Sequence, residues 1–135
     1  MYRAVALALL LSACAGGDPA GDAAKPCDGL LEPADPSVTL PPRLPAGVAD
    51  PVFYKTQRAG ATTLWFAHAS GDDVVVVRDA IAGTFESAGF TIESRDEEPP
   101  AEAEFQFTAA KDEGSVQVTP LCAGRVTVRW RLGPR

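Results

Sequence analysis

The second half of the chain alternates between apolar and polar residues, which is the pattern of β-strands with one buried face. The clearest run is 125–132, where every second residue from Val126 to Leu132 is apolar and arginine or threonine stands between. The same period predicts strands over 52–57, 62–69, 90–95, 104–109 and 116–119. Short polar turns join most of these runs and favour antiparallel pairing, and we expect the acidic stretch 96–102 to be a solvated loop.

Residues 74–88 follow a helical period instead. Four consecutive valines at 74–77 favour a strand, but the apolar stripe continues for several turns beyond them, so we predict a helix. Asp72, or Ser70 together with Asp73, suits its N-terminal cap, and Gly89 suits its C-terminal end. The stripe comprises Val74, Val77, Ile81, Phe85 and Ala88, and it leaves Arg78 and Asp79 outside the buried face.

These elements predict an α+β fold with two layers, in which one amphipathic helix covers an antiparallel sheet of five to six strands. Along the chain the order is β-β-α-β-β-β-β. The predicted core consists of Val77, Ile81, Phe85, Phe90, Ile92, Phe105, Phe107, Val116, Val118, Val126, Val128, Trp130 and Leu132.

The first 50 residues have a different composition. Eight of the twelve prolines lie between residues 15 and 51, and proline fixes φ and removes a backbone donor, so this stretch predicts an extended spacer. Its second half carries four apolar residues, so it is either a free tether or an ordered coil packed on the domain. We divide the chain into residues 1–13, a tether over 14–50 and a domain over 51–135. The four apolar residues are Val38, Leu40, Leu44 and Val48.

The sequence Leu11-Ser12-Ala13-Cys14 ends a short apolar segment that follows Arg3. It resembles the lipobox of bacterial lipoproteins. The resemblance implies a signal peptide over 1–13, removed after a diacylglyceryl group is attached to Cys14, and a mature protein anchored by fatty acyl chains such as palmitate. That protein would lie outside the cytoplasm, on a membrane of the cell envelope. The alternatives are an ordinary secretory peptide with a chance cysteine, or a buried apolar helix.

If Cys14 carries lipid, Cys27 and Cys122 are left to form a disulfide in an oxidising compartment. Two free thiols, or a bridge to another chain, are the alternatives. Removing residues 1–13 takes away Arg3 and no acidic residue, which lowers the formal charge from −6 to −7. This acidity argues against binding nucleic acid and against docking on anionic lipid headgroups. We therefore expect the mature protein to associate with the membrane through the lipid on Cys14.

The sequence offers little catalytic chemistry. His68 is the only histidine and has no acid at a matching position, so we interpret it as a strand residue with one buried face. The acidic residues near 96–104 are interrupted by prolines and lack the spacing of a calcium loop. No phosphate-binding glycine loop, zinc-protease helix motif or serine-hydrolase turn occurs. We therefore expect no enzyme, no cofactor and no metal site.

The last predicted strand carries Arg125, Arg129 and Arg131 on its polar face. If Leu64 and Phe66 face the core, Trp65 lies beside these arginines, and an arginine-flanked tryptophan is a typical interface anchor. The alternatives are ordinary cross-strand charge pairing, and a Trp65 covered by the spacer.

The domain also resembles small α+β domains that follow a proline-rich spacer in uncharacterised bacterial lipoproteins. The resemblance lies in the turn Gly89-Phe90-Thr91-Ile92 after the helix, and it implies no activity. We expect a non-catalytic interaction module that binds an envelope protein or wall glycan. Two alternatives are a small-molecule or glycan-binding module with a pocket between helix and sheet, and a structural envelope protein.

Overall fold

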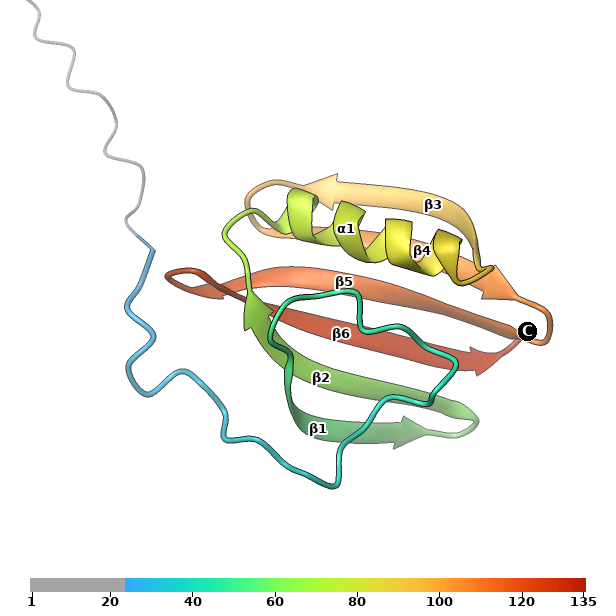
Figure 1. Ribbon diagram of the computed structural model, residues 1–135, viewed down its shortest axis with the longest axis horizontal. Helices are drawn as coiled ribbons and strands as arrows, with labels where there is room; N and C mark the ends of the chain where they lie inside the picture. The colour runs from blue at the N-terminus through green and yellow to red at the C-terminus, as the bar shows by residue number, and fades with distance from the viewer. Residues whose placement is uncertain (1–23) are drawn as a thin grey trace, which may run out of the picture.

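The computed structural model describes residues 24–135, and these form one helix and six strands (Figure 1). All strand pairs are antiparallel and belong to one open sheet with the order β1-β2-β6-β5-β4-β3. The predicted two-layer α+β fold is confirmed. The elements are β1 (Val52–Ala59), β2 (Thr62–Ser70), α1 (Val74–Ser87), β3 (Thr91–Glu98), β4 (Glu102–Ala109), β5 (Asp112–Cys122) and β6 (Arg125–Pro134).

The sheet consists of a hairpin and a meander joined through the helix. β1 and β2 form the hairpin, and β3 to β6 follow one another as neighbours. α1 carries the chain from β2 to the far edge of the sheet, so the last strand, β6, fits between β2 and β5. The helix packs over β3, β4 and β5 on one face, which we call the inner face (Figure 1).

The helix begins one residue later than Asp72 would place it. Asp73 is the N-cap, and its carboxylate accepts hydrogen bonds from the backbone N–H groups of Val75 at 2.9 Å and Val76 at 3.2 Å. These bonds satisfy donors that have no partner inside the helix. At the other end, Gly89 adopts a φ of 92°, which closes the helix as expected.

The prediction that Arg78 lies outside the buried face is wrong: only 3 % of the residue is exposed. Its Nη1 donates to the carbonyl oxygens of Asp96 at 2.9 Å and Glu104 at 3.3 Å. Its Nη2 bonds to the carboxylate of Glu97, and its Nε to that of Asp79. The guanidinium is thus fully engaged between α1 and the strands beneath, which is how a charged group is tolerated in the interior. The buried helix face is correspondingly rotated, leaving Val77 half-buried and Ala88 exposed.

The acidic stretch predicted as a loop over 96–102 is mostly strand. β3 continues to Glu98 and β4 starts at Glu102, so only 99–101 form the turn. Pairing of Asp96 with Glu104 and of Glu98 with Glu102 extends the hairpin. The backbone ladder, with Arg78 bound beside it, outweighs the poor strand propensity of acidic residues.

The proline-rich stretch from residue 24 to 51 is a coil without helix or strand, which we call the strap, and its second half packs on the sheet. Val38 and Leu44 are buried in the core, and Leu40, Ala46 and Val48 pack against it. Figure 1 shows this part of the strap on the inner face, beside α1. At Gly47 the φ is 70°, and a Cβ there would lie 3.0 Å from the Cα of Ile81, so the close approach to the helix requires glycine.

The start of the strap is fixed to the β5–β6 turn. Cys27 and Cys122 form a disulfide, and Ala123 N donates to the carbonyl oxygen of Lys25 at 2.8 Å. Further on, Asp35 N donates to Phe53 O at 2.9 Å, which ties the strap to the edge strand β1. Cys14 and the predicted signal peptide lie outside the described residues, and so does the first part of the predicted tether.

Aromatic rings fill the space between helix and sheet. The Phe85 ring from α1 lies 5.2 Å from Phe105, 4.8 Å from Phe107 and 5.0 Å from Phe90, measured between centroids. Burial of Phe85, Phe105 and Phe107, which are at most 1 % exposed, supplies much of the hydrophobic stabilisation. The predicted core residues are buried, apart from Val77, Phe90 and Ile92, which are half-buried at its margin.

Candidate functional site

The strand register settles which side chains share each face of the sheet. Trp65 of β2 pairs with Trp130 of β6, so both belong to the inner face. Only 8 % of Trp65 is exposed, and it belongs to the same core cluster as Val38 and Leu44 of the strap. The structure therefore does not bring Trp65 together with Arg125, Arg129 and Arg131. Of the alternatives given for Trp65, the structure shows the one in which the proline-rich segment covers it.

The opposite side of the sheet, which we call the outer face, carries the three predicted arginines. Across β2 and β6, Phe66 pairs with Arg129 and Leu64 with Arg131, while Ser70 pairs with Arg125. The face of β2 that carries Leu64, Phe66 and His68 is therefore the outer one, so Leu64 and Phe66 do not face the core. Both faces of β2 are apolar enough to be buried, so alternation within this strand could not distinguish them.

Arg125 is already engaged within the protein. Its Nη2 lies 2.8 Å from His68 Nδ1, and its Nη1 donates to Ser70 Oγ at 3.0 Å. Because a guanidinium only donates, Nδ1 of His68 must be the acceptor, and the ring proton sits on Nε2. That proton is donated to the carbonyl oxygen of Glu32 in the strap, at 3.1 Å. Both ring nitrogens of His68 are thus occupied, and the cluster fastens the strap to the outer face.

Tyr54 and Phe66 add aromatic surface beside this cluster. The Tyr54 ring stacks on His68 with centroids 6.2 Å apart, and Lys55 Nζ lies 5.0 Å above the Phe66 ring. Burial raises the pKa of the Tyr54 hydroxyl, the nearby charge of Glu32 raises it further, and a hydrogen bond with Thr127 opposes both. Phe53 pairs with the inner Ala67, so Tyr54 lies on the outer face by ordinary alternation, and a bulge between Phe53 and Lys55 places Lys55, which pairs with Phe66, on that face as well. Nothing in the sequence alternation indicates such a bulge.

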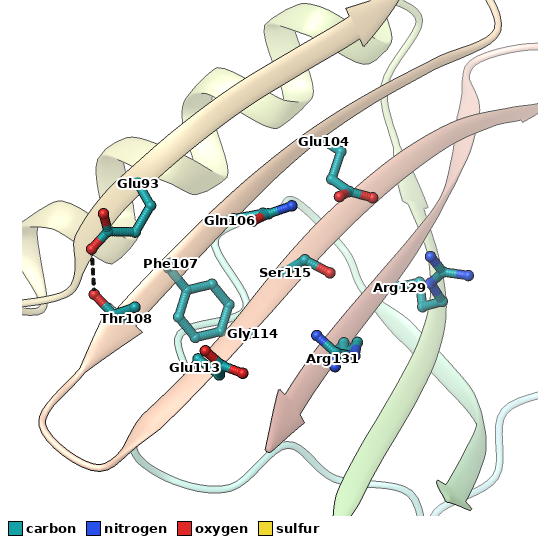
Figure 2. A pocket seen from close by; sticks show the side chains of 10 residues that line it. All are labelled: Glu93, Glu104, Gln106, Phe107, Thr108, Glu113, Gly114, Ser115, Arg129 and Arg131. Carbon is teal, nitrogen blue, oxygen red and sulfur yellow. Dashed lines mark hydrogen bonds between the residues drawn. The ribbon is translucent and has the colours of Figure 1, made fainter. Parts of the chain in front are cut away.

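Arg129 and Arg131 border a hollow of about 390 Å³ on the outer face, which we call the outer pocket (Figure 2). Figure 2 shows Glu104 and Gln106 of β4 on one side, Arg129 and Arg131 of β6 on the other, and Ser115 of β5 between them. Glu93 and Glu113 complete the polar lining. The floor is low because β5 carries the short side chain of Ser115 here, between Gln106 and Arg131. Gly114 pairs with Phe107 and Leu132, so its missing side chain is on the inner face. A Cβ on Gly114 would lie 2.6 Å from Phe107 Cζ.

The two arginines of the outer pocket are not neutralised within the part of the chain that the structure describes. Neither forms an ion pair there, and the Nε of Arg129 is buried without a hydrogen-bond partner among those residues. On the acidic side, Glu93 accepts from the Thr108 hydroxyl at 2.7 Å. The direct cross-strand pairing expected as the ordinary role of these arginines is absent between residues 24 and 135.

Comparison with known proteins finds no matching family model, no matching curated protein and no matching solved structure. The site therefore has to be interpreted from its own geometry. Within residues 24–135, no group of three or more histidine, cysteine or acidic residues is placed to hold a metal ion. The single helix described there is too short and too polar to cross a membrane.

Proposed function

We propose that this is a lipid-anchored protein of the bacterial cell envelope that binds another envelope component through its outer pocket, without catalysing a reaction. The anchor rests on Leu11-Ser12-Ala13-Cys14, where the thiol would carry the lipid. The binding role rests on the outer pocket.

The observation that carries the binding role is the pair of unneutralised arginines beside an open hollow. An unpaired guanidinium in a partly buried position favours an external acceptor, since a desolvated donor without a hydrogen bond costs about 1–3 kcal/mol. The Arg129 Nε is such a donor among residues 24–135. A ligand that accepts from Arg129 and Arg131 recovers this energy. Arg125 Nε is also without a partner among residues 24–135, but its Nη atoms are bound to His68 and Ser70, and Arg125 does not line the outer pocket.

The helix–sheet interface is a poorer site for a ligand. Phe85, Phe105 and Phe107 are at most 1 % exposed and lie in ring contact with one another. A small molecule would have to displace these rings. Catalysis by His68 is also disfavoured, because both ring nitrogens already form hydrogen bonds.

Co-sedimentation of the purified domain with an insoluble envelope fraction tests the binding role. Charge-assisted hydrogen bonds contribute about 1.5–3 kcal/mol each, so Arg129→Gln/Arg131→Gln should weaken binding by at least about tenfold. The matched control is Arg58→Gln/Lys111→Gln, which removes the same charge from exposed positions outside the outer pocket. Equal binding by the wild type and both double variants would contradict the proposal.

Mass spectrometry of the mature N-terminus tests the anchor separately. The expected product begins at an acylated Cys14, and Cys14→Ser should shift the protein from the membrane to the soluble fraction. An unmodified thiol on a chain that still carries residues 1–13 would contradict the anchor and leave the binding role to be judged on its own test.

A further inference from the structure

The two sides of the outer pocket carry opposite charges, and the register fixes their separation. One row across the sheet runs from Glu104 on β4 through Gln117 on β5 to Arg129 on β6. The next row runs from Gln106 through Ser115 to Arg131. Neighbouring strands lie about 4.7–4.9 Å apart, so the acidic and basic strands are separated by roughly 9–10 Å.

This separation explains why the opposite charges do not pair directly. The intervening positions on β5 are polar but uncharged, and Gln117 is turned toward Glu102, to which its amide donates at 2.8 Å. Ser115 has a short side chain, so it fills little of the middle of the pocket. The result is a hollow with Glu104 on one side, Arg129 and Arg131 on the other, Ser115 between them and Glu113 of β5 at one end (Figure 2).

The charge balance of the lining restricts the ligand. Three carboxylates (Glu93, Glu104 and Glu113) face two guanidinium groups, so a simple anion attracted by the arginines is repelled by the acids. A neutral sugar can hydrogen-bond to both sets of side chains, but it offers no charge opposite to either set. A ligand with a carboxylate at one end and an ammonium group at the other satisfies both, because arginine recognises a carboxylate through two parallel hydrogen bonds.

From this arrangement we propose that the outer pocket binds the zwitterionic end groups of a short peptide, with the carboxylate on Arg129 and Arg131 and the ammonium group on Glu104. The inference deepens the proposed function and rests on it. An extended chain reaches about 3.3–3.6 Å per residue, so two residues span about 7 Å and can bridge side chains that extend from strands 9–10 Å apart. The volume of about 390 Å³ lies within the ordinary range of small-ligand sites, about 300–1,000 Å³.

The test is a titration followed by amide NMR, using alanylalanine as the probe. Two blocked probes serve as controls: N-acetyl-alanylalanine, which lacks the ammonium group, and alanylalanine amide, which lacks the carboxylate. Alanylalanine should cause saturable shifts at outer-face residues of β4, β5 and β6, and each blocked peptide should bind at least about tenfold more weakly.

Variants assign each charge to its side of the pocket. Arg129→Gln/Arg131→Gln should bind alanylalanine and its amide equally, while Glu104→Gln should bind alanylalanine and its acetylated form equally. Arg58→Gln, on the other side of the sheet, should retain the wild-type preference. Such paired comparisons isolate the interaction between one side chain and one ligand group.

Equal affinity of the wild type for free and blocked peptides, or shifts that do not saturate, would overturn the zwitterion proposal. If arginine-dependent sedimentation with the envelope fraction persists in that case, the proposed function stands and only this ligand class is rejected. If sedimentation is lost as well, both are rejected. The blocked peptides are tested on the wild type, so the outcome does not depend on how the variants fold.

Discussion

Removal of the Cys27–Cys122 disulfide should destabilise the domain strongly. The two residues are 95 positions apart, so the bridge closes a loop that contains almost the entire domain. In the chain-entropy model, a loop of about 100 residues restricts the unfolded chain by about 4.7 kcal/mol. Without the bridge the start of the strap also gains freedom in the native state, which offsets part of the entropy gained by the unfolded chain. We therefore expect Cys27→Ala/Cys122→Ala to lower the free energy of unfolding by about 3–4 kcal/mol.

Urea unfolding followed by tryptophan fluorescence measures this loss, because Trp65 and Trp130 are both buried in the native state. The midpoint should fall, and the dependence of the unfolding free energy on urea should steepen, because the unlinked chain exposes more surface when it unfolds. Wild-type protein kept reduced is the matched control and should behave like the double variant. A loss below about 1 kcal/mol would refute the reasoning, since it would mean that the bridge does not restrict the unfolded chain.

Three further predictions concern the strap, the helix and the outer face. Gly47→Ala should lower the free energy of unfolding by about 2–3 kcal/mol in thermal or urea unfolding, because alanine is strained at this positive φ and its Cβ would contact Ile81. Gly29 has a similar φ with open space around it, so Gly29→Ala should cost only about 1–2 kcal/mol. Equal losses would contradict close packing of the strap on α1. Arg78→Ala should lower the free energy of unfolding by about 2–3 kcal/mol, because its hydrogen bonds to carbonyl oxygens are lost. Arg95 is half-exposed, so Arg95→Ala should cost at most about 1 kcal/mol. A smaller loss at Arg78 than at Arg95 would overturn the role assigned to Arg78. The pKa of Tyr54 is raised above 10.0 in the folded state. The contribution of Tyr54 to the free energy of unfolding is therefore fully present below pH 10 and is lost as the pH rises through the pKa of the folded state. The difference between the ultraviolet titration curves of the wild type and Tyr54→Phe should give the titration midpoint of Tyr54. Glu32→Gln should lower this midpoint, and a midpoint at or below pH 10 would contradict desolvation of the hydroxyl.

The strands could be predicted because their alternation is strict and their turns are short. In β6, each apolar residue from Val126 to Leu132 faces the core, as the period of two requires. The helix could also be predicted in spite of its four valines, because Ile81 and Phe85 continue the stripe and pack on the sheet. Tertiary packing thus decided against the local preference for a strand.

The errors arise where long-range partners decide the outcome. Arg78 is polar by type, and its burial is favourable because it meets the carbonyl groups of β3 and β4 and the carboxylates of Asp79 and Glu97. Trp65 and Phe66 are adjacent aromatics, and pairing with Trp130 on β6 determines that Trp65 is the inner one. The arginines could be assigned to one face from the sequence, but the outer pocket between β4 and β6 depends on strand neighbours that periodicity does not specify.

The attachment of Cys27 to the β5–β6 turn also limits how far the domain can move from a membrane. If lipid holds Cys14, thirteen residue steps separate it from the disulfide, a reach of at most about 45 Å. Without the bridge, the first contact that ties the strap to the sheet is the hydrogen bond between Glu32 and His68, and the reach lengthens to roughly 60 Å. If the proposed lipid anchor holds, the disulfide therefore shortens the largest distance between the bilayer and the point where the strap joins the domain by about a quarter.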